Sequence, residues 1–244
     1  MFISQKKSFI KSGLLNDMVD VHSHILPGID DGAGTYDEAV KSLRWLKSKG
    51  IHRIYLTPHV MTDYPQNTRK YILEQFEIFN NKLENDGIED IPKLKPGAEY
   101  MLEPAFENYK TEELLTYADR HVLVETSYIT PPIGFLSILE KLMEDGYSPV
   151  LAHPERYNYM DMKDYKHLNK EGILFQLNFL SITGAYGRHA KEKALQLLSD
   201  GLYKYAGSDF HHLARYEGYY QLKSLTKKQT TALQYLIDNN EELW

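Results

Sequence analysis

Short apolar runs alternate with helical patterns along most of the chain. The apolar runs indicate buried strands, whereas the longer segments repeat apolar residues every three or four positions, as amphipathic helices do. Gly50, Gly87, Gly146 and Gly201 follow predicted helices and mark their ends. The predicted strands are residues 18–22, 51–57, 93–98, 122–125, 149–152, 173–179 and 202–206, and the predicted helices are residues 35–49, 72–83, 104–117, 133–145, 162–170, 188–199 and 226–240.

The regular alternation of strands and helices favours an α/β fold with a parallel sheet. A chain of 244 residues with 42% hydrophobic content can bury a large core, and α/β barrels of this length are commonly one domain. We therefore expect a single domain over residues 1–244, with residues 1–17 as an adaptable N-terminal lead-in. No window predicts a membrane span or a secretory leader, so we expect a cytoplasmic protein.

The composition of the chain excludes several kinds of binding surface and catalytic group. A formal net charge of -6 without long Lys/Arg runs argues against a nucleic-acid-binding surface. The chain has no cysteine, which excludes disulfides, thiolate metal ligands and a cysteine nucleophile. Any hydrolytic mechanism must therefore use other groups.

Histidines and acids cluster directly after the predicted strands. His22 and His24 alternate on one strand, so both imidazoles can face the same point. In a parallel α/β barrel the carboxyl ends of the strands form one mouth, where such residues would converge. A shared metal site explains them together, since a crowd of buried acids and histidines needs cations. The candidate ligands are His22, His24, Asp31, His59, Glu99, Glu125, His153, Asp209 and His211, and the sixth strand contributes none.

Each candidate also has an ordinary structural explanation. His59 could cap a turn, Glu99 could neutralise a lysine, and Asp209 could cap a helix N-terminus. Four other histidines lie at strand starts or on helices and are expected at the opposite end or on the surface: His52, His121, His167 and His189. Mixed imidazole and carboxylate ligation without sulfur suits Mn, Fe or Zn.

Two arginines accompany this set. Arg156 closely follows His153, and a guanidinium beside metal ions is unfavourable unless an anion also binds there. Arg215 follows His211 and could act in the same way. Metal ions with arginine side chains suggest a phosphoryl substrate. The alternatives are a structural pair of Arg156 with Glu155 or with a distant carboxylate, and a solvated charge for Arg215.

The motifs resemble the metal-dependent protein tyrosine phosphatases of capsule and exopolysaccharide biosynthesis, within the polymerase and histidinol phosphatase (PHP) superfamily. They occur in the family's order and span nearly the whole chain. The matching stretches are Asp-Val-His-Ser-His-Ile-Leu-Pro-Gly-Ile-Asp-Asp-Gly at residues 20–32, Thr-Pro-His at 57–59, Gly-Ala-Glu-Tyr at 97–100, Val-Glu-Thr at 124–126, Ala-His-Pro-Glu-Arg-Tyr at 152–157 and Gly-Ser-Asp-Phe-His at 207–211.

This resemblance implies a distorted seven-stranded TIM-like barrel, the PHP fold, with three divalent metal ions, often manganese. It assigns one metal to His22, His24, Glu99 and Asp209, a second to Glu99, Glu125 and His153, and a third to Asp31, His59 and His211. It also implies, as a partner, the phosphorylated tyrosine-rich tail of a membrane-associated bacterial tyrosine autokinase. Neither nucleic acid nor direct membrane insertion is expected.

We expect phosphotyrosine hydrolysis by a metal-activated hydroxide, with Arg156 and Arg215 neutralising the phosphoryl oxygens. The nearest alternative is a small-molecule phosphomonoesterase such as histidinol phosphatase, because the same ligand set would support both activities. A metal-stabilised scaffold without activity is a further alternative. A scaffold would be expected to have lost ligands or Arg156, and all of them are present.

Overall fold

The computed structural model describes residues 6–104, 106, 114–118 and 120–244. Within these ranges every strand pairing is parallel, as the alternating pattern predicts. One sheet has the order β1 (Val19–Asp20), β2 (Arg53–Leu56) and β4 (Lys93–Pro96), and the other has the order β3 (His59–Val60), β5 (Glu99–Met101), β6 (His121–Glu125), β7 (Ser148–Ala152), β8 (Leu174–Asn178) and β9 (Tyr205–Gly207).

The two sheets meet where the chain breaks after β2 and β4 and forms a new strand just beyond the predicted strands at residues 51–57 and 93–98. β2 leads into β3 after Thr57 and Pro58, and β4 leads into β5 after Gly97 and Ala98. Pro58 has no N–H to donate to a strand ladder, which favours a break at that point. Its carbonyl still accepts a hydrogen bond from Glu99 N at 3.0 Å, so the two chain segments stay side by side.

The first and last strands are also joined through their backbones. Ser23 and Phe210 form a parallel bridge. The N–H of His24 donates to Phe210 O at 2.7 Å, and that of Asp209 donates to His22 O at 2.8 Å. Segments nearly two hundred residues apart in sequence therefore lie against each other at the end of the sheet.

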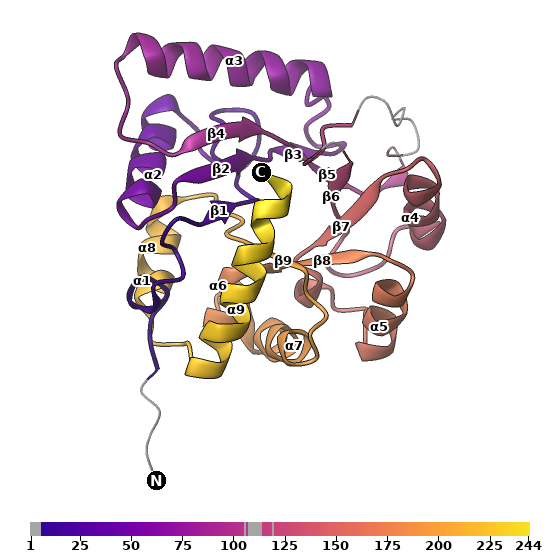
Figure 1. The fold of residues 1–244 in the computed structure, drawn as a ribbon. Helices are drawn as coiled ribbons and strands as arrows, with labels where there is room; N and C mark the ends of the chain where they lie inside the picture. Colours follow the sequence, from indigo (N-terminus) through magenta and orange to yellow (C-terminus); the bar gives the residue numbers. More distant parts are fainter. Residues whose placement is uncertain (1–5, 105, 107–113, 119) are drawn as a thin grey trace.

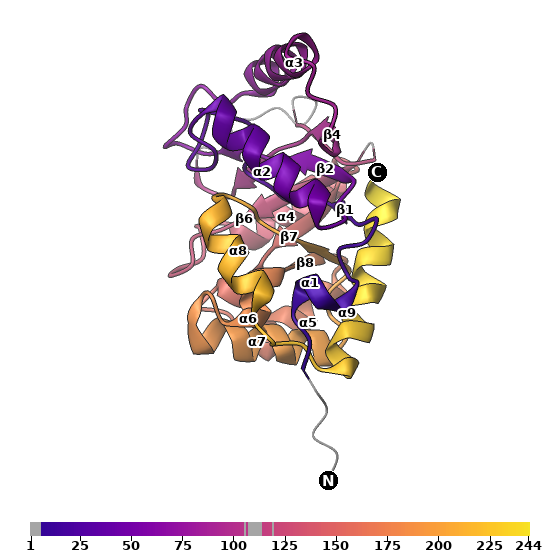
Figure 2. The same cartoon turned by 90° about the vertical axis from the view of Figure 1, so that its left-hand side faces the viewer.

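The helices lie around the outside of the strands (Figures 1 and 2). Side-chain caps start several of them: Thr35, Thr68, Asp161 and Thr226 accept hydrogen bonds from N–H groups of the first turn. None of the described helices is both long and apolar enough to cross a membrane. The helices are α1 (Phe9–Ser12), α2 (Tyr36–Ser48), α3 (Arg69–Asn85), α4 (Phe135–Glu144), α5 (Met162–Lys170), α6 (Phe179–Thr183), α7 (Gly187–Ser199), α8 (Leu213–Gln221) and α9 (Lys227–Asn239), with short 3-10 turns at Pro154–Arg156 and Asn240–Leu243.

The N-terminal segment differs from the prediction of an adaptable lead-in. Phe9 is completely buried, and its ring lies 5.3 Å from those of both Phe179 and Tyr220. Lys7 pairs with Leu225 in an antiparallel bridge. The aromatic contacts thus fix the segment from Lys7 onward against α6 and α8.

Three of the described helices were not predicted, and one prediction lies mostly outside the described residues. α1 and α6 are only four and five residues long, too short to show a periodic pattern. α8 buries Tyr216 and Tyr220, one turn apart, within an otherwise polar segment. The predicted helix at residues 104–117 lies largely outside the part of the chain that the structure describes.

Candidate metal centre

The structure brings all nine candidate ligands together where the strands end. His22, His24 and Glu99 are completely buried, and Glu125, His153 and Asp209 are about 1% exposed. Nearer the solvent, the side chains of His59 and His211 are 12% and 21% exposed and that of Asp31 is 57% exposed. The four histidines expected elsewhere do not join the cluster, and His52, His167 and His189 are exposed.

Hydrogen bonds determine which ring nitrogen carries the hydrogen in His22 and in His24. His22 Nδ1 lies 3.1 Å from Gln176 Oε1, and the Gln176 amide nitrogen donates to Leu177 O, which turns the amide oxygen toward the imidazole. His24 Nδ1 lies 2.8 Å from Asp30 Oδ2. Both partners are acceptors, so each Nδ1 carries the hydrogen. In both neutral rings the Nε2 atom is therefore left with a free lone pair.

These two lone pairs face each other among carboxylate oxygens. His22 Nε2 and His24 Nε2 are 3.1 Å apart. Glu99 Oε2 lies 3.2 and 3.3 Å from them, and Asp209 Oδ1 lies 3.3 and 3.4 Å away. Four acceptors at these distances repel one another unless a cation lies between them. With metal–ligand bonds of about 2.1 Å, neighbouring ligands are about 3.0 Å apart in an octahedron and about 3.4 Å in a tetrahedron, so the four atoms fit a divalent metal.

The shifted pKa values of residues in the cluster also show that the site favours positive charge. Burial works against protonation of His22, but the carboxylates of Glu99 and Asp209 outweigh it and raise the His22 pKa above its usual value. Burial would also raise the pKa of Glu99, yet His22 and His153 hold that pKa well below its usual range. The carboxylates thus stay ionised and keep the site ready for a cation.

A second group shares Glu99. His59 Nδ1 lies 3.1 Å from both Glu99 Oε2 and Glu125 Oε1. His153 Nε2 lies 3.1 Å from Glu99 Oε1 and 3.7 Å from Glu125 Oε2. His59 Nδ1, Glu99 Oε2 and the second oxygen of Glu125 are buried without a well-oriented hydrogen bond, although they are close to one another. Such closeness without hydrogen-bond alignment is expected of atoms that point at a shared metal ion.

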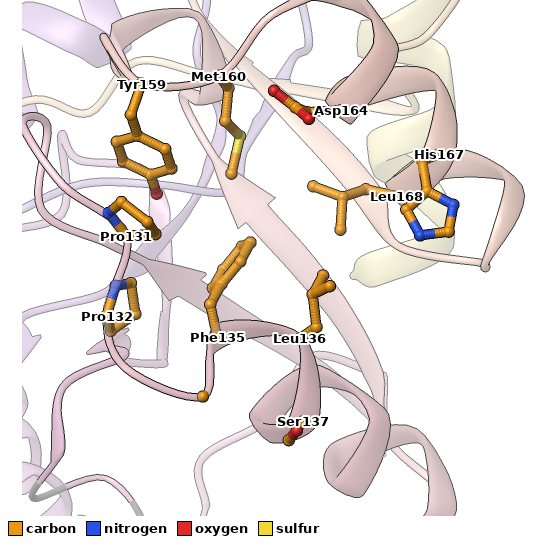
Figure 3. A pocket seen from close by; sticks show the side chains of 11 residues that line it. Pro131, Pro132, Phe135, Leu136, Ser137, Tyr159, Met160, Asp164, His167 and Leu168 are labelled. Atoms are coloured by element: carbon orange, nitrogen blue, oxygen red, sulfur yellow. The ribbon is translucent and has the colours of Figure 1, made fainter.

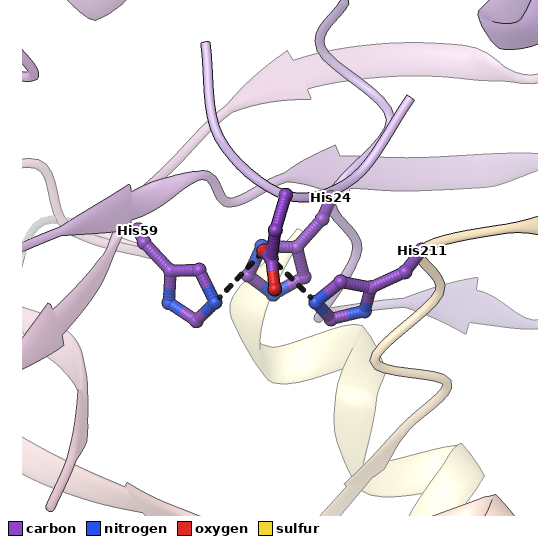
Figure 4. Close-up of side chains that lie close together, drawn as sticks. His24, His59 and His211 are labelled. Atoms are coloured by element: carbon purple, nitrogen blue, oxygen red, sulfur yellow. Dashed lines mark ion pairs between the residues drawn. The ribbon is translucent and has the colours of Figure 1, made fainter. Parts of the chain in front are cut away.

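A third group lies at the solvent side. His59 Nε2 and His211 Nε2 each lie 3.4 Å from Asp31 Oδ1 (Figure 4). The His24 ring stacks on that of His211 with centroids 4.0 Å apart. Within the described residues, the ligand atoms of His24, Asp31, His59 and His211 could hold one ion. His59 therefore offers one nitrogen to each of two groups, whereas the family resemblance assigns it to one.

Two candidate ligands have a strained backbone conformation. His153 has φ 35° and Asp209 has φ 53°, the left-handed region that non-glycine residues rarely adopt. Beside them, a Cβ on Gly207 would lie 2.8 Å from His22 Cβ and 2.6 Å from Gln176 Nε2. Only glycine lets β9 approach the first strand closely enough to place Asp209.

Arg156 lies beside the cluster in an aromatic clamp. Its Nη1 donates to Asp209 Oδ2 at 3.1 Å. Its guanidinium carbon lies 4.2 Å from the centre of the Tyr128 ring and 4.1 Å from that of Tyr186. Of the two structural pairings considered for Arg156, the one with a distant carboxylate is present, as the contact with Asp209. Glu155 instead accepts hydrogen bonds from Asn178 N and Tyr203 OH. Arg156 is thus held at the site.

Arg215, on α8, contacts the ring of Tyr186 as well. Its guanidinium carbon lies 4.5 Å from the centre of the Tyr186 ring. The residue is exposed, unlike Arg156, whose side chain is only 17% exposed. Both candidate arginines therefore contact Tyr186.

Four residues that contact the cluster were not predicted from the sequence. Asp30 orients His24, although Asp31 was the acid chosen from the Asp-Asp pair. Gln176 and Asn178 come from β8, the strand expected to contribute nothing, and Asn178 Nδ2 donates to Asp209 Oδ2 at 2.6 Å. Gln176 and Asn178 could have been found in the sequence, because they are polar residues two positions apart in a strand that is otherwise apolar. Tyr186 had no sequence signal, because one tyrosine in a loop does not show what it contacts.

Known proteins are similar to this chain in both sequence and fold. A family model for capsular polysaccharide synthesis, CpsB/CapC, matches residues 18–240. The chain belongs to this family. Tyrosine-protein phosphatase YwqE of Bacillus subtilis (strain 168) is 30% identical over 233 residues, which cover 93% of this chain and 91% of that protein. Tyrosine-protein phosphatase CpsB of Streptococcus agalactiae serotype V is 26% identical over 208 residues, covering 80% and 84%.

A solved structure extends the likeness to three dimensions. It comes from the crystal structures of YwqE from Bacillus subtilis and CpsB from Streptococcus pneumoniae, described as unique metal-dependent tyrosine phosphatases. It superposes with a TM-score of 0.81 at 28% identity, covering 93% of each chain. Membership of the CpsB/CapC family confirms the resemblance drawn from the motifs. Metal dependence in this relative agrees with the unpaired acceptor atoms at the site.

Proposed function

We propose that this protein is a metal-dependent protein-tyrosine-phosphatase acting in capsular polysaccharide synthesis. The observation that carries the proposal is the group of facing acceptor atoms on His22, His24, Glu99 and Asp209, next to the guanidinium of Arg156. A metal site and a fixed guanidinium side by side suit a phosphate monoester, whose charge both can neutralise.

The ligand set fits three divalent ions. His22, His24, Glu99 and Asp209 would hold the first, Glu99 and Glu125 with His153 the second, and Asp31, His59 and His211 the third. Glu99 would bridge the first two. Manganese is the proposed ion, with iron or zinc as alternatives, since the donors are nitrogen and oxygen only. When bound, such ions lower the pKa of water from about 15.7 to about 7 and polarise phosphoryl oxygens.

The protein's own residues position and neutralise the substrate. Arg156, held between Tyr128 and Tyr186, would donate to non-bridging phosphoryl oxygens, where charge must be stabilised in a loose transition state. Arg215 would approach from α8. A phenolic leaving group with a pKa of about 10 departs with little need for protonation, so aryl phosphates should react faster than alkyl phosphates.

The fold would support this site as one domain. If β2 with β3 and β4 with β5 are each taken as one strand, the described residues would contain seven strands. The backbone bonds between residues 22–24 and 209–210 would close them into a distorted barrel. The site would then lie at the mouth formed by the strand ends.

The proposed partner is a phosphorylated tyrosine-rich tail of a membrane-associated bacterial tyrosine kinase. The names of the relatives support a protein substrate over histidinol phosphate. Tyrosine phosphorylation consumes cytoplasmic ATP, so the proposal also places this protein in the cytoplasm.

Phosphate release by the metal-loaded protein tests the proposal. Phosphotyrosine peptides should be hydrolysed at least tenfold faster than histidinol phosphate, and chelation should abolish both activities. Glu99→Ala should do the same while circular dichroism shows an intact fold. Activity that survives complete metal removal would contradict the proposal, as would a preference for histidinol phosphate.

A further inference from the structure

We propose that a groove between α4 and α5 binds an apolar side chain of the protein substrate close to its phosphotyrosine. The inference rests on the proposed phosphatase function and extends it to sequence selection. The groove has a volume of about 500 Å³ (Figure 3). Its apolar lining includes Pro131, Pro132, Phe135, Leu136, Met160 and Leu168.

Exposed apolar residues occur among the lining residues of the groove and next to them in sequence. Ile129 is 75% exposed and Ile133 is 88% exposed, and both belong to the loop that leads into α4. Leu136, on the first turn of α4, is 47% exposed. Other exposed large apolar residues among the described ones lie on separate elements, such as Ile78 on α3. A concentration of exposed apolar surface around a hollow indicates a surface that a ligand covers.

The groove lies next to the metal centre, and a layer of tyrosine side chains separates the two. The loop leaves β6 directly after Glu125, and the hydroxyl of Thr126 is hydrogen-bonded to that of Tyr159, which lines the groove. Tyr157 stacks on Tyr159 with ring centroids 5.9 Å apart and lies 6.0 Å from the His153 ring. Tyrosine rings thus form the wall between the metal ligands and the groove.

The loop that contacts Arg156 also lines the groove. Tyr128 stacks on Arg156, and Pro131 lines the groove three residues further on. An extended peptide advances about 3.3 Å per residue. A phosphotyrosine at Arg156 would therefore leave neighbouring substrate residues near Tyr128 and the groove.

The polar groups of the groove favour an apolar occupant over a charged one. Asp164 accepts a hydrogen bond from Asp161 N at 2.7 Å as part of the cap of α5. His167 lies 3.7 Å from Glu171 on the same helix. The polar atoms of Asp164 and His167 thus have neighbours in or next to α5, and the Tyr159 hydroxyl is hydrogen-bonded to Thr126. Ser137 is the other polar side chain among the lining residues, and most of the remainder is apolar.

The test compares substrates that do and do not reach the groove. Phosphotyrosine peptides carrying either leucine or serine at each of the three positions on either side are assayed beside p-nitrophenyl phosphate, which is too small to fill it. We expect the wild type to prefer leucine at one or two positions by about tenfold in kcat/KM, because part of a leucine side chain is buried. Leu136→Lys should abolish that preference through KM and leave p-nitrophenyl phosphate hydrolysis unchanged.

Ile78→Lys is the matched control, since it places the same charge at an exposed apolar position on α3 and should keep the preference. The inference is overturned if the wild type treats all leucine and serine peptides alike, or if Leu136→Lys slows both substrate types equally. It is also overturned if Leu136→Lys only changes the sedimentation coefficient, which would make the groove a contact between two copies of the chain. If the wild type hydrolysed neither substrate type, the proposed function would fail, and fluorescence anisotropy of the labelled peptides would still report the leucine preference.

Discussion

Asp209 accepts a hydrogen bond from Arg156 through one oxygen, at 3.1 Å, and turns its other oxygen toward His22 Nε2, at 3.3 Å. A single carboxylate thus connects the candidate metal ligands to the guanidinium proposed to bind phosphate. The Asp209 carboxylate is buried, and the nearby histidines hold its pKa well below the usual range despite that burial. The two halves of the site are therefore fixed relative to each other.

Removal of the Arg156 guanidinium should affect turnover much more than metal content. Arg156→Met should lower kcat/KM for phosphotyrosine peptides by about a hundredfold or more, the cost of losing one positioned transition-state donor. Arg156→Lys should recover little, because an ammonium cannot replace the planar fork between two rings. Arg188→Met, on the exposed surface of α7, serves as the control. Unchanged kinetics in Arg156→Met would remove this residue from the mechanism.

Tyr186 should act through its ring more than through its hydroxyl. The ring contacts both arginines. The hydroxyl accepts a hydrogen bond from Asn178 Nδ2 at 3.1 Å and lies 3.5 Å from Asp209 Oδ2, but Asn178 Nδ2 also donates to Asp209 directly. We expect Tyr186→Phe to stay within about threefold of wild-type kcat and Tyr186→Leu to fall by about tenfold, since the loss of stacking frees the guanidinium groups. Steady-state kinetics with p-nitrophenyl phosphate measure this difference. Equal effects of the two substitutions would argue against the clamp.

Asp31 should be needed for only one metal ion. It contacts His59 and His211 at the solvent side and lies outside the buried group around Glu99. Asp31→Asn should reduce the bound metal by one equivalent, whereas His22→Ala should disturb the bridged pair and remove more. Inductively coupled plasma mass spectrometry of dialysed protein gives the count, with Asp63→Asn as an exposed control. Identical losses in both site variants would show that the groups are not separable.

Lys193 should stabilise the loop that separates the site from the groove. From α7 its ammonium donates to Tyr157 O and Met160 O and lies 3.3 Å from Tyr165 OH. Partial burial lowers its pKa. Lys193→Met leaves these carbonyls without a donor and should reduce the free energy of unfolding by about 2 kcal/mol in urea titrations. Lys191→Met is the neighbouring control, and an equal effect there would contradict a specific role for Lys193.

The sequence predicted the site residues better than their surroundings. His22, His24, Glu99 and Asp209 could be found because they follow apolar runs, and parallel strands bring their carboxyl ends together. The same rule located the strands to within a few residues. Helix α5 was predicted with its observed bounds, since Asp161 caps a clear helical pattern.

Contacts made only in three dimensions could not be predicted in this way. Asp30 and Asp31 are adjacent, and which one faces His24 depends on how the loop folds back. Tyr186 reaches Arg156 from a turn thirty residues further along the chain. The docking of Phe9 depends on rings in α6 and α8, which local periodicity does not reveal.

Anomalous diffraction from crystals of the manganese-loaded protein would locate the metal bound by His22 and His24. We predict an anomalous peak between them, about 2.0–2.3 Å from both Nε2 atoms and from oxygens of Glu99 and Asp209. A map without metal density at that point, with the two imidazoles joined by a proton, would contradict it.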